Sequence, residues 1–126
     1  MRRPLHEKFL GCATITDVSA ASSSAPIPCP YDGRVVEIIG TLAAAITVAN
    51  SAVTLEISKA GGAFVAATGT MVVAFTGSAA GSTFRVKLSG LNAVSRGDAI
   101  RFTSDGGSTT SAGLACAAIV SESSGI

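Results

Sequence analysis

Short segments in which apolar and polar residues alternate recur along the chain from about residue 34 onwards. Residues 53–58 and 84–89 are the clearest examples, and residues 100–103 repeat the pattern. An alternation of period two puts the apolar side chains on one face of a strand, as in half-buried antiparallel sheets. Two further apolar sets lie at Met71, Val73 and Phe75 and at residues 113–120. The pattern predicts roughly seven or eight short strands.

Turn-forming residues separate these segments at Asn50-Ser51, Gly61-Gly62, Gly77-Ser78, Gly81-Ser82, Gly90 and Gly106-Gly107. The strands and turns together predict an all-β fold, an antiparallel β-sandwich of jelly-roll-like topology with an extended N-terminal arm. Two segments are ambiguous. Residues 41–49 fit either a helical turn or a strand, and Val35 and Ile39 suggest that the strand around Glu37 is buried on both sides.

The first 32 residues differ from the rest of the chain. Ser and Ala fill residues 19–24, and Pro26, Pro28 and Pro30 follow at alternate positions. Proline restricts its own φ and pushes the residue before it towards extended conformations, so this stretch predicts a stiff strap. We therefore predict an extended arm and Pro-rich strap over residues 1–32 and a β-sandwich domain over residues 33–126. Residues 13–18 fit a short strand that pairs with an edge of another subunit.

Charge is sparse along the chain. Charged residues make up 13% of the 126 residues, and the net charge is +1. A surface with few charges favours association, since large apolar patches usually mark contacts. With no Trp, one Tyr and five Phe, the core depends on small side chains. This also favours further burial of apolar surface against another subunit. The scattered basic residues lack the clustering that nucleic-acid binding needs.

Residues that could carry catalysis or hold a cofactor are scarce. His6 is the one histidine and lies in the predicted arm, so no catalytic triad with a rigid base is expected. The acidic residues are not paired at short spacing, and Cys12, Cys29 and Cys116 show no C-x-x-C spacing. Cys116 lies in an apolar segment and is expected to be buried, and the thiols fit a reducing compartment. The sequence predicts no enzyme, no cofactor, no metal site and no small-molecule substrate.

Three further features of the sequence bear on packing and on possible partners. Arg96-Gly97-Asp98 spells an integrin-binding tripeptide, but Gly-Asp before an apolar pair is also an ordinary turn that leads into a strand. Glu56 is expected to pair across strands with Arg85 or Lys87. No stretch approaches the ~20 apolar residues of a membrane helix, so no membrane partner is expected.

Two segments carry a family resemblance. Residues 46–57 read Ile-Thr-Val-Ala-Asn-Ser-Ala-Val-Thr-Leu-Glu-Ile, and residues 94–100 read Val-Ser-Arg-Gly-Asp-Ala-Ile, with Ser-Asp-Gly-Gly-Ser following at 104–108. Over about residues 33–122, the chain resembles the head decoration (cement) proteins of tailed bacteriophages. The resemblance implies a homotrimer that is made in the host cytoplasm and placed on the capsid surface of the virion. There it would clamp neighbouring subunits of the major capsid protein, with no catalytic residues.

The arm would make the capsid contacts. The expected capsid-binding residues are Arg2, Arg3, Leu5, Phe9, Leu10, Pro26, Pro28 and Pro30. The alternative is a carbohydrate- or receptor-binding virion module that uses the loops at residues 77–82 and 104–111, although only Tyr31 outside the Phe set is available to stack on a sugar. A secreted or cellular adhesin is a further alternative, and it is disfavoured because no signal segment is evident.

Overall fold

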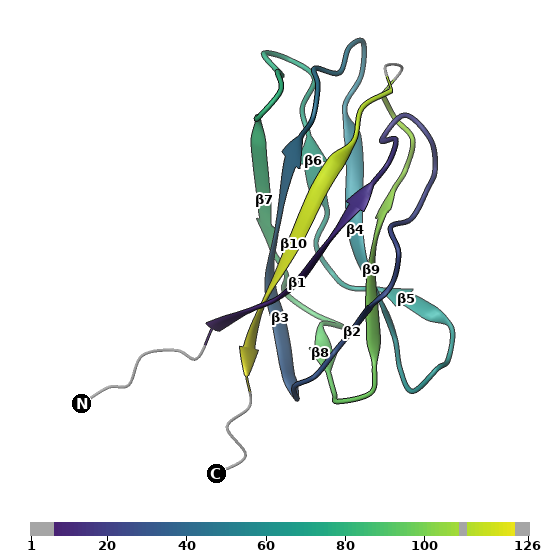
Figure 1. Ribbon diagram of the computed structural model, residues 1–126, viewed down its shortest axis with the longest axis vertical. Helices are drawn as coiled ribbons and strands as arrows, with labels where there is room; N and C mark the ends of the chain where they lie inside the picture. The colour runs from purple at the N-terminus through teal and green to yellow at the C-terminus, as the bar shows by residue number, and fades with distance from the viewer. Residues whose placement is uncertain (1–6, 109–110, 123–126) are drawn as a thin grey trace, which may run out of the picture.

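Two antiparallel β-sheets pack face to face in the computed structural model, which describes residues 7–108 and 111–122 (Figure 1). The predicted all-β sandwich is therefore confirmed. The strands are β1 (Glu7–Ile15), β2 (Ile27–Pro28), β3 (Gly33–Leu42), β4 (Ser51–Ser58), β5 (Phe64–Ala66), β6 (Met71–Val73), β7 (Thr83–Lys87), β8 (Ala93–Val94), β9 (Ala99–Ser104) and β10 (Leu114–Glu122). The jelly-roll connection stays a prediction.

The chain crosses repeatedly between the two sheets. Sheet A has the order β1-β10-β3-β7, and β8 pairs with the start of β3. Sheet B has the order β2-β9-β4-β5, and β6 pairs with the start of β4. The first and last strands are neighbours, since Glu7 of β1 pairs with Ser121 of β10. Both described ends of the chain therefore leave the sandwich at the same end (Figure 1).

The core follows the alternation seen in the sequence. Val53, Leu55 and Ile57 of β4 are buried, and Ile100 and Phe102 of β9 are fully buried beside them. Cys116, Met71 and Val73 are also buried, as predicted. The prediction for Phe75 was wrong: this side chain is 37% exposed, because β6 ends at Val73 and the chain turns away.

A β-bulge explains why β3 looked buried on both sides. In the pairing of β10 with β3, Val120 lies opposite Val35 while Ile119 lies opposite Glu37, so Val36 is an extra residue. A bulge of this kind shifts the alternation by one position. Val35 therefore faces the core before the bulge, and Ile38 and Leu42 face it afterwards.

The predicted boundary at residue 32 differs from the structure, because residues 7–32 belong to the sandwich. β1 pairs along its length with β10 of the same chain. Ile15 and Val18 are fully buried in the core. Gly11 allows a close approach to the other sheet, since a Cβ here would lie 2.8 Å from Cγ2 of Ile27. Burial of this apolar surface outweighs the entropy of a free arm.

The Pro-rich strap forms the edge of sheet B. Ser24 exchanges two hydrogen bonds with Phe102: its backbone N–H donates to the carbonyl of Phe102 (2.8 Å), and its Oγ accepts from the N–H of Phe102 (3.0 Å). Ile27 then pairs with Ile100 as β2. Pro26, Pro28 and Pro30 are exposed. Proline is tolerated on an edge strand because its missing N–H faces solvent.

Residues 43–50 form neither a helix nor a strand. β3 ends at Leu42, and the loop returns through a tight turn at Val48, where the N–H of Ala49 donates to the carbonyl of Thr47 (2.9 Å). Val48 has a φ of 75° and is 70% exposed, so an apolar β-branched residue is held in a strained conformation at the tip.

Candidate functional site

The outer surface of sheet A is apolar around β1 and β10. The core-facing residues of β10 alternate with Ala115, Ala117 and Ile119, which therefore point outward. Their neighbours in register are Thr14, Cys12 and Phe9 on β1 and Thr41, Ile39 and Glu37 on β3. The apolar part of this surface is termed the A face: Phe9, Cys12, Ile39, Ala115, Ala117 and Ile119. Ala115 and Ala117 are small, so another surface could approach β10 closely at this part of the A face.

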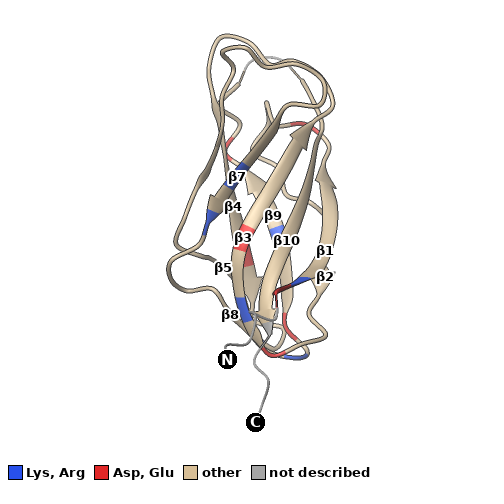
Figure 2. Ribbon diagram, turned by 90° about the vertical axis from the view of Figure 1, so that its left-hand side faces the viewer, with Lys and Arg blue, Asp and Glu red and all other residues tan. Residues whose placement is uncertain are grey.

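Charged residues of sheet A lie along one margin of the A face. Arg85 and Lys87 of β7 are opposite Ile39 and Glu37 of β3, and Nε of Arg85 lies 3.3 Å from Oε2 of Glu37. Figure 2 shows this distribution, with charge on β3 and β7 and most of β10 in tan. The margin and the apolar centre together have the arrangement of a docking surface with a polar rim.

The outer surface of sheet B is polar and internally bonded over β4 and β9, whereas Val72 of β6 is an exposed apolar side chain at its margin. Oε1 of Glu56 accepts hydrogen bonds from Nε of Arg101 (2.7 Å) and Oγ1 of Thr103 (3.1 Å). The guanidinium of Arg101 also lies 4.1 Å from the ring centroid of Phe64. This surface is termed the B face: Ser23, Thr54, Glu56, Phe64, Arg101 and Thr103. Ser23, Glu56, Arg101 and Thr103 are bonded to one another on this face.

A second bulge controls the direction of Phe9. In β1, Phe9 is opposite Ile119 while Gly11 is opposite Ala118, so Leu10 is the extra residue. Leu10 turns inward and is 8% exposed, while Phe9 stays outside and is 59% exposed. Lys8 is held nearby, with Nζ 4.8 Å from the ring centroid of Tyr31. The bulge thus presents a large aromatic side chain at the edge of the A face.

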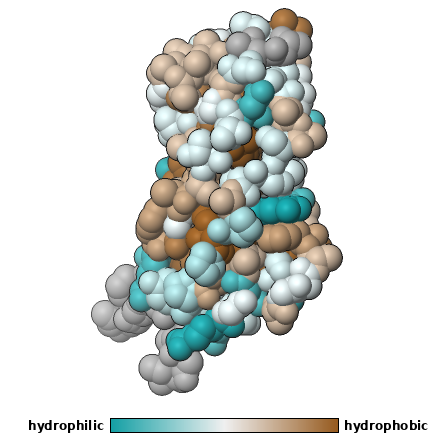
Figure 3. All heavy atoms as spheres, turned by 45° about the vertical axis from the view of Figure 1, so that its right-hand side comes forward, coloured by the Kyte–Doolittle hydropathy of each residue, from teal (hydrophilic) through white to brown (hydrophobic). Residues whose placement is uncertain are grey.

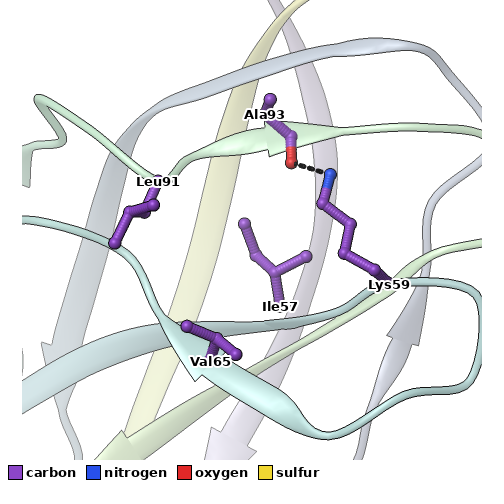
Figure 4. Close-up of a pocket in the computed structure, with 5 residues that line it drawn as sticks. All are labelled: Ile57, Lys59, Val65, Leu91 and Ala93. Atoms are coloured by element: carbon purple, nitrogen blue, oxygen red, sulfur yellow. Dashed lines mark hydrogen bonds between the residues drawn. The ribbon is translucent and has the colours of Figure 1, made fainter.

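An apolar pocket of about 280 Å³ lies at the opposite edge of the sandwich. Ile57 of β4 and Val65 of β5 form its wall in sheet B, while Leu91 and Ala93 form its wall at β8 of sheet A. Figure 4 shows Ile57 in the middle of the group, with Val65, Leu91, Ala93 and Lys59 around it. Val65 is 57% exposed and Leu91 70% exposed, so the rim is open to solvent.

The position of Lys59 is fixed by two partners. Its Nζ donates to the carbonyl of Ala93 and lies 3.3 Å from Oδ2 of Asp98. Asp98 is buried and also accepts hydrogen bonds from the N–H groups of Ser95 (2.9 Å) and Ala60 (3.1 Å). Burial alone would raise the pKa of Asp98, but these donors and Lys59 together lower it below its usual value.

The Arg96-Gly97-Asp98 tripeptide is a structural turn. The N–H of Asp98 donates to the carbonyl of Ser95 (3.0 Å), and Gly97 has a φ of 96°. Because the Asp98 carboxylate is buried and bonded within the chain, it is not presented to a partner. The reading of this motif as a turn before β9 is confirmed.

The residues predicted to bind the capsid fall into separate places. Arg2, Arg3 and Leu5 lie outside the described residues. The prediction for Leu10 as a surface contact was wrong, because the β1 bulge turns it into the core. Phe9 is on the A face, whereas Pro26, Pro28 and Pro30 lie along the edge of sheet B. The predicted pairing of Glu56 with Arg85 or Lys87 was also wrong, because Glu56 and these two residues belong to different sheets.

The three cysteines are free and differ sharply in exposure. Cys12 is exposed on the A face, whereas Cys29 and Cys116 are buried. Burial, assisted by the nearby Asp98 charge, raises the pKa of Cys29 to about 11. Burial alone raises the pKa of Cys116 to about 12. The two buried thiols therefore act as small apolar side chains.

Two further observations concern the described residues. In residues 7–108 and 111–122, no three His, Cys, Asp or Glu side chains come together as a metal site. That part of the chain also contains no helix long and apolar enough to cross a membrane. The two loops predicted as an alternative sugar-binding site lie at the end of the sandwich near Leu42 and Ser51. Tyr31 lies at the other end, just before β3 (Figure 1).

Comparison with known proteins shows the fold. The sequence matches no family model and no curated protein. Eiger TNF from S. frugiperda has a TM-score of 0.52 at 10% identity over 96% of this chain and 94% of its own. The CocE/NonD family hydrolase SACOL2612 from Staphylococcus aureus has a TM-score of 0.50 at 6% identity over 90% of this chain and 33% of its own. A chain of the cyanophage Pam1 capsid asymmetric unit has a TM-score of 0.48 at 21% identity, over 98% and 93%.

Proposed function

We propose that this protein is a structural component of a phage virion, which binds the outside of the capsid as a homotrimer and clamps neighbouring major capsid subunits. The sequence resemblance over about residues 33–122 suggests this role, and the A face is the observation that carries it. The protein lies on the capsid surface of the virion in this proposal, and catalysis has no part in its function.

The A face fits a permanent contact better than a solvent-exposed surface. Its centre is formed by Ile39, Ala117 and Ile119, three apolar residues in adjacent rows of β3 and β10. Few charged residues elsewhere on the surface would oppose association, since the whole chain carries only 13% charged residues. In Figure 3, brown and pale atoms predominate on the side shown, and the teal atoms form a few separate patches. An apolar centre with a charged margin is typical of a protein-binding surface.

Stabilisation of the shell would follow from binding alone. A protein that binds assembled capsid subunits and not unfolded ones stabilises the assembled state by mass action. Three linked copies would convert weak single contacts into strong attachment, because the second and third contacts become intramolecular. Such a mechanism requires an exposed apolar surface and no catalytic groups.

Capsids that lack the protein provide the test. Purified protein is added to such capsids, bound protein is measured by co-sedimentation, and shell stability is measured by thermal release of DNA. We expect saturable binding and a higher release temperature. Ile119→Lys places a charge in the centre of the A face and should weaken binding at least about tenfold.

Thr54→Lys is the matched control, because it adds the same charge to a central strand of the B face. It should bind like the wild type. Equal loss of binding in both variants, or none in Ile119→Lys, would reject the A face as the contact surface. Absence of binding by folded wild-type protein would reject the virion role.

The N-terminal residues Arg2, Arg3 and Leu5 remain proposed capsid contacts. Deleting residues 1–6 tests them without removing β1, which begins at Glu7. Reduced binding by a variant with unchanged circular dichroism would support a contact, and unchanged binding would reject it.

A further inference from the structure

We propose that copies of this chain join head to tail, with Phe9 of one copy inserted into the apolar pocket at the opposite edge of the next. Phe9 lies at the edge of the A face, so the centre of that face stays free for the capsid. Repeating this contact closes a ring, which supplies the homotrimer of the proposed function. The number of copies rests on that function, whereas the contact itself rests on the geometry described below.

The pocket has the size and chemistry to hold a phenyl ring. Its volume is about 280 Å³, and its walls include Ile57, Val65, Leu91 and Ala93. A cavity of about 150 Å³ with apolar walls is enough to bind benzene in another protein. One aromatic side chain therefore fits, with room for the backbone that carries it.

Phe9 is the side chain of this chain best suited to fill the pocket. It is the most exposed of the large aromatic residues, at 59%, and the β1 bulge keeps it outside the core. Aromatic side chains supply the most contact area of any residue. Because the adjacent Leu10 is anchored in the core, Phe9 is presented on a rigid strand and loses little freedom on binding.

The charges beside Phe9 and beside the pocket are complementary. Glu7 is exposed and lies two residues before Phe9 on the same outward side of β1, since both pair with outward-facing residues of β10. Lys59 is at the rim of the pocket; its ammonium is paired with the buried Asp98 on one side, and its side chain is still 58% exposed to a second carboxylate. Insertion of Phe9 brings a carboxylate towards this ammonium, which favours one orientation of the contact.

The two contact sites lie at opposite edges of one end of the sandwich. At this end, sheet A reads β1-β10-β3-β8, so Phe9 is on one edge strand and Ala93 on the other. The row of Phe9 crosses β3 at Glu37, and Ala93 pairs with Arg34, which places the sites about 10 Å apart along the strands. Head-to-tail contacts between opposite edges form a ring when the rotation between copies closes.

Leu91 is held in a strained conformation at the mouth of the pocket. Its φ is 50°, in the left-handed region that disfavours residues with a Cβ, yet its side chain is 70% exposed. Strained residues cluster at ligand contacts, and here the strain places an exposed apolar side chain at the lining of the pocket. A neighbouring Phe9 ring would cover Leu91 and give it a packing partner.

The mass of the full chain in solution tests the contact directly. Light scattering after size exclusion, over a range of concentrations, should give three times the chain mass for the wild type. Phe9→Ala and Leu91→Asp should each weaken association about 30-fold or more and yield monomers with unchanged circular dichroism. Thr14→Ala and Val72→Asp are the matched controls on β1 and on an exposed Val outside the pocket, and both should remain trimeric.

A mixture of the two variants provides a second readout. Phe9→Ala keeps an intact pocket and Leu91→Asp keeps an intact Phe9, so the mixture should form dimers of one copy of each in native mass spectrometry. A ring cannot close from these chains. If one variant fails to fold, the other variant still tests the contact. Glu7→Lys tests it as well, because its effect on association should depend on the salt concentration.

Each other outcome has a defined meaning. A monomeric wild type, or a Phe9→Ala variant that stays trimeric, would overturn the inference even if capsid binding were intact. Loss of capsid binding by a trimeric Phe9→Ala variant would mean that Phe9 contacts the capsid itself, and it would also overturn the inference. A trimer that behaves as described but does not bind capsids would reject the proposed function and leave the contact established.

Discussion

The two outer faces of the sandwich differ in how their side chains are used. On the B face, Glu56, Arg101 and Thr103 bond to one another across β4 and β9. On the A face, Ile39 and Ile119 lie at the same kind of central position, but they are partly exposed apolar side chains with no polar group to bond. The comparison shows that the two faces of one sandwich can differ in whether their outward side chains bond to one another.

The largest expected difference is in thiol reactivity, between Cys12 on the A face and the buried Cys29 and Cys116. At pH 8, raised pKa values of about 11 and about 12 leave Cys29 and Cys116 with roughly 10²- and 10³-fold less thiolate than an ordinary thiol of pKa 9.0. We expect brief iodoacetamide treatment to alkylate Cys12 alone. Mass spectrometry of peptides locates the label, and protein unfolded in urea, labelled at all three, is the control. Rapid labelling of Cys116 in folded protein would contradict its burial.

The buried ion pair should contribute more to the free energy of unfolding than the exposed one. Asp98 is buried with two backbone donors and Lys59, so Asp98→Asn should lower the free energy of unfolding by about 2 kcal/mol. Glu37→Gln breaks the pair with the 65% exposed Arg85 and should cost less than about 1 kcal/mol. Urea denaturation at pH 7 measures both.

Acid should remove the difference between wild type and Asp98→Asn. The pKa of Asp98 is lowered in the folded protein, so its contribution is fully present above the unfolded pKa of about 3.9 and is lost as pH falls below it. The two unfolding curves should therefore converge below about pH 4. A gap that persists at pH 2 would show that the variant loses packing and not charge.

Breaking the B face should cost stability and not association. Glu56→Gln weakens the hydrogen bonds from Arg101 and Thr103 and should lower the free energy of unfolding by about 1 kcal/mol. Thr14→Ala, beside the A face, should change it by less than about 0.5 kcal/mol. Thermal denaturation of the two variants measures the contrast, and a larger cost at Thr14 would reverse the comparison.

A change that belongs to neither face should have the smallest effect. Val48→Gly releases the strain of a φ of 75° in an exposed loop and should raise the free energy of unfolding by about 0.5 kcal/mol. Chemical denaturation measures the gain. Ala44→Gly in the same loop is the control and should give no gain, because residue 44 has no positive φ to relieve.

The strands could be predicted from the sequence because alternation is a local signal. Val53, Leu55 and Ile57 reveal their inward face within eight residues of chain. Alternation does not reveal partners, however, since every half-buried strand has the same period. Glu56 was therefore assigned to the cations of β7 when its partner was Arg101 of β9, in the other sheet.

The role of residues 7–32 could not be predicted from composition. Proline and serine are typical of extended linkers, and here they also suit the edge of sheet B, where a missing N–H is harmless. The partner of β1 lies about a hundred residues away in β10, beyond the reach of any local pattern. One signal for the A face was present: residues 113–120 are apolar at successive positions, which means that both sides of that strand avoid water.

The place of β10 in sheet A affects how the protein is made. β10 is the last of the described strands, yet it lies between β1 and β3 and pairs with both. During synthesis, β1 leaves the ribosome first and has no pairing partner until residues 114–122 follow. Sheet A is therefore completed only after translation of its central strand. Until then, the edges of β1 and β3 that pair with β10 stay exposed.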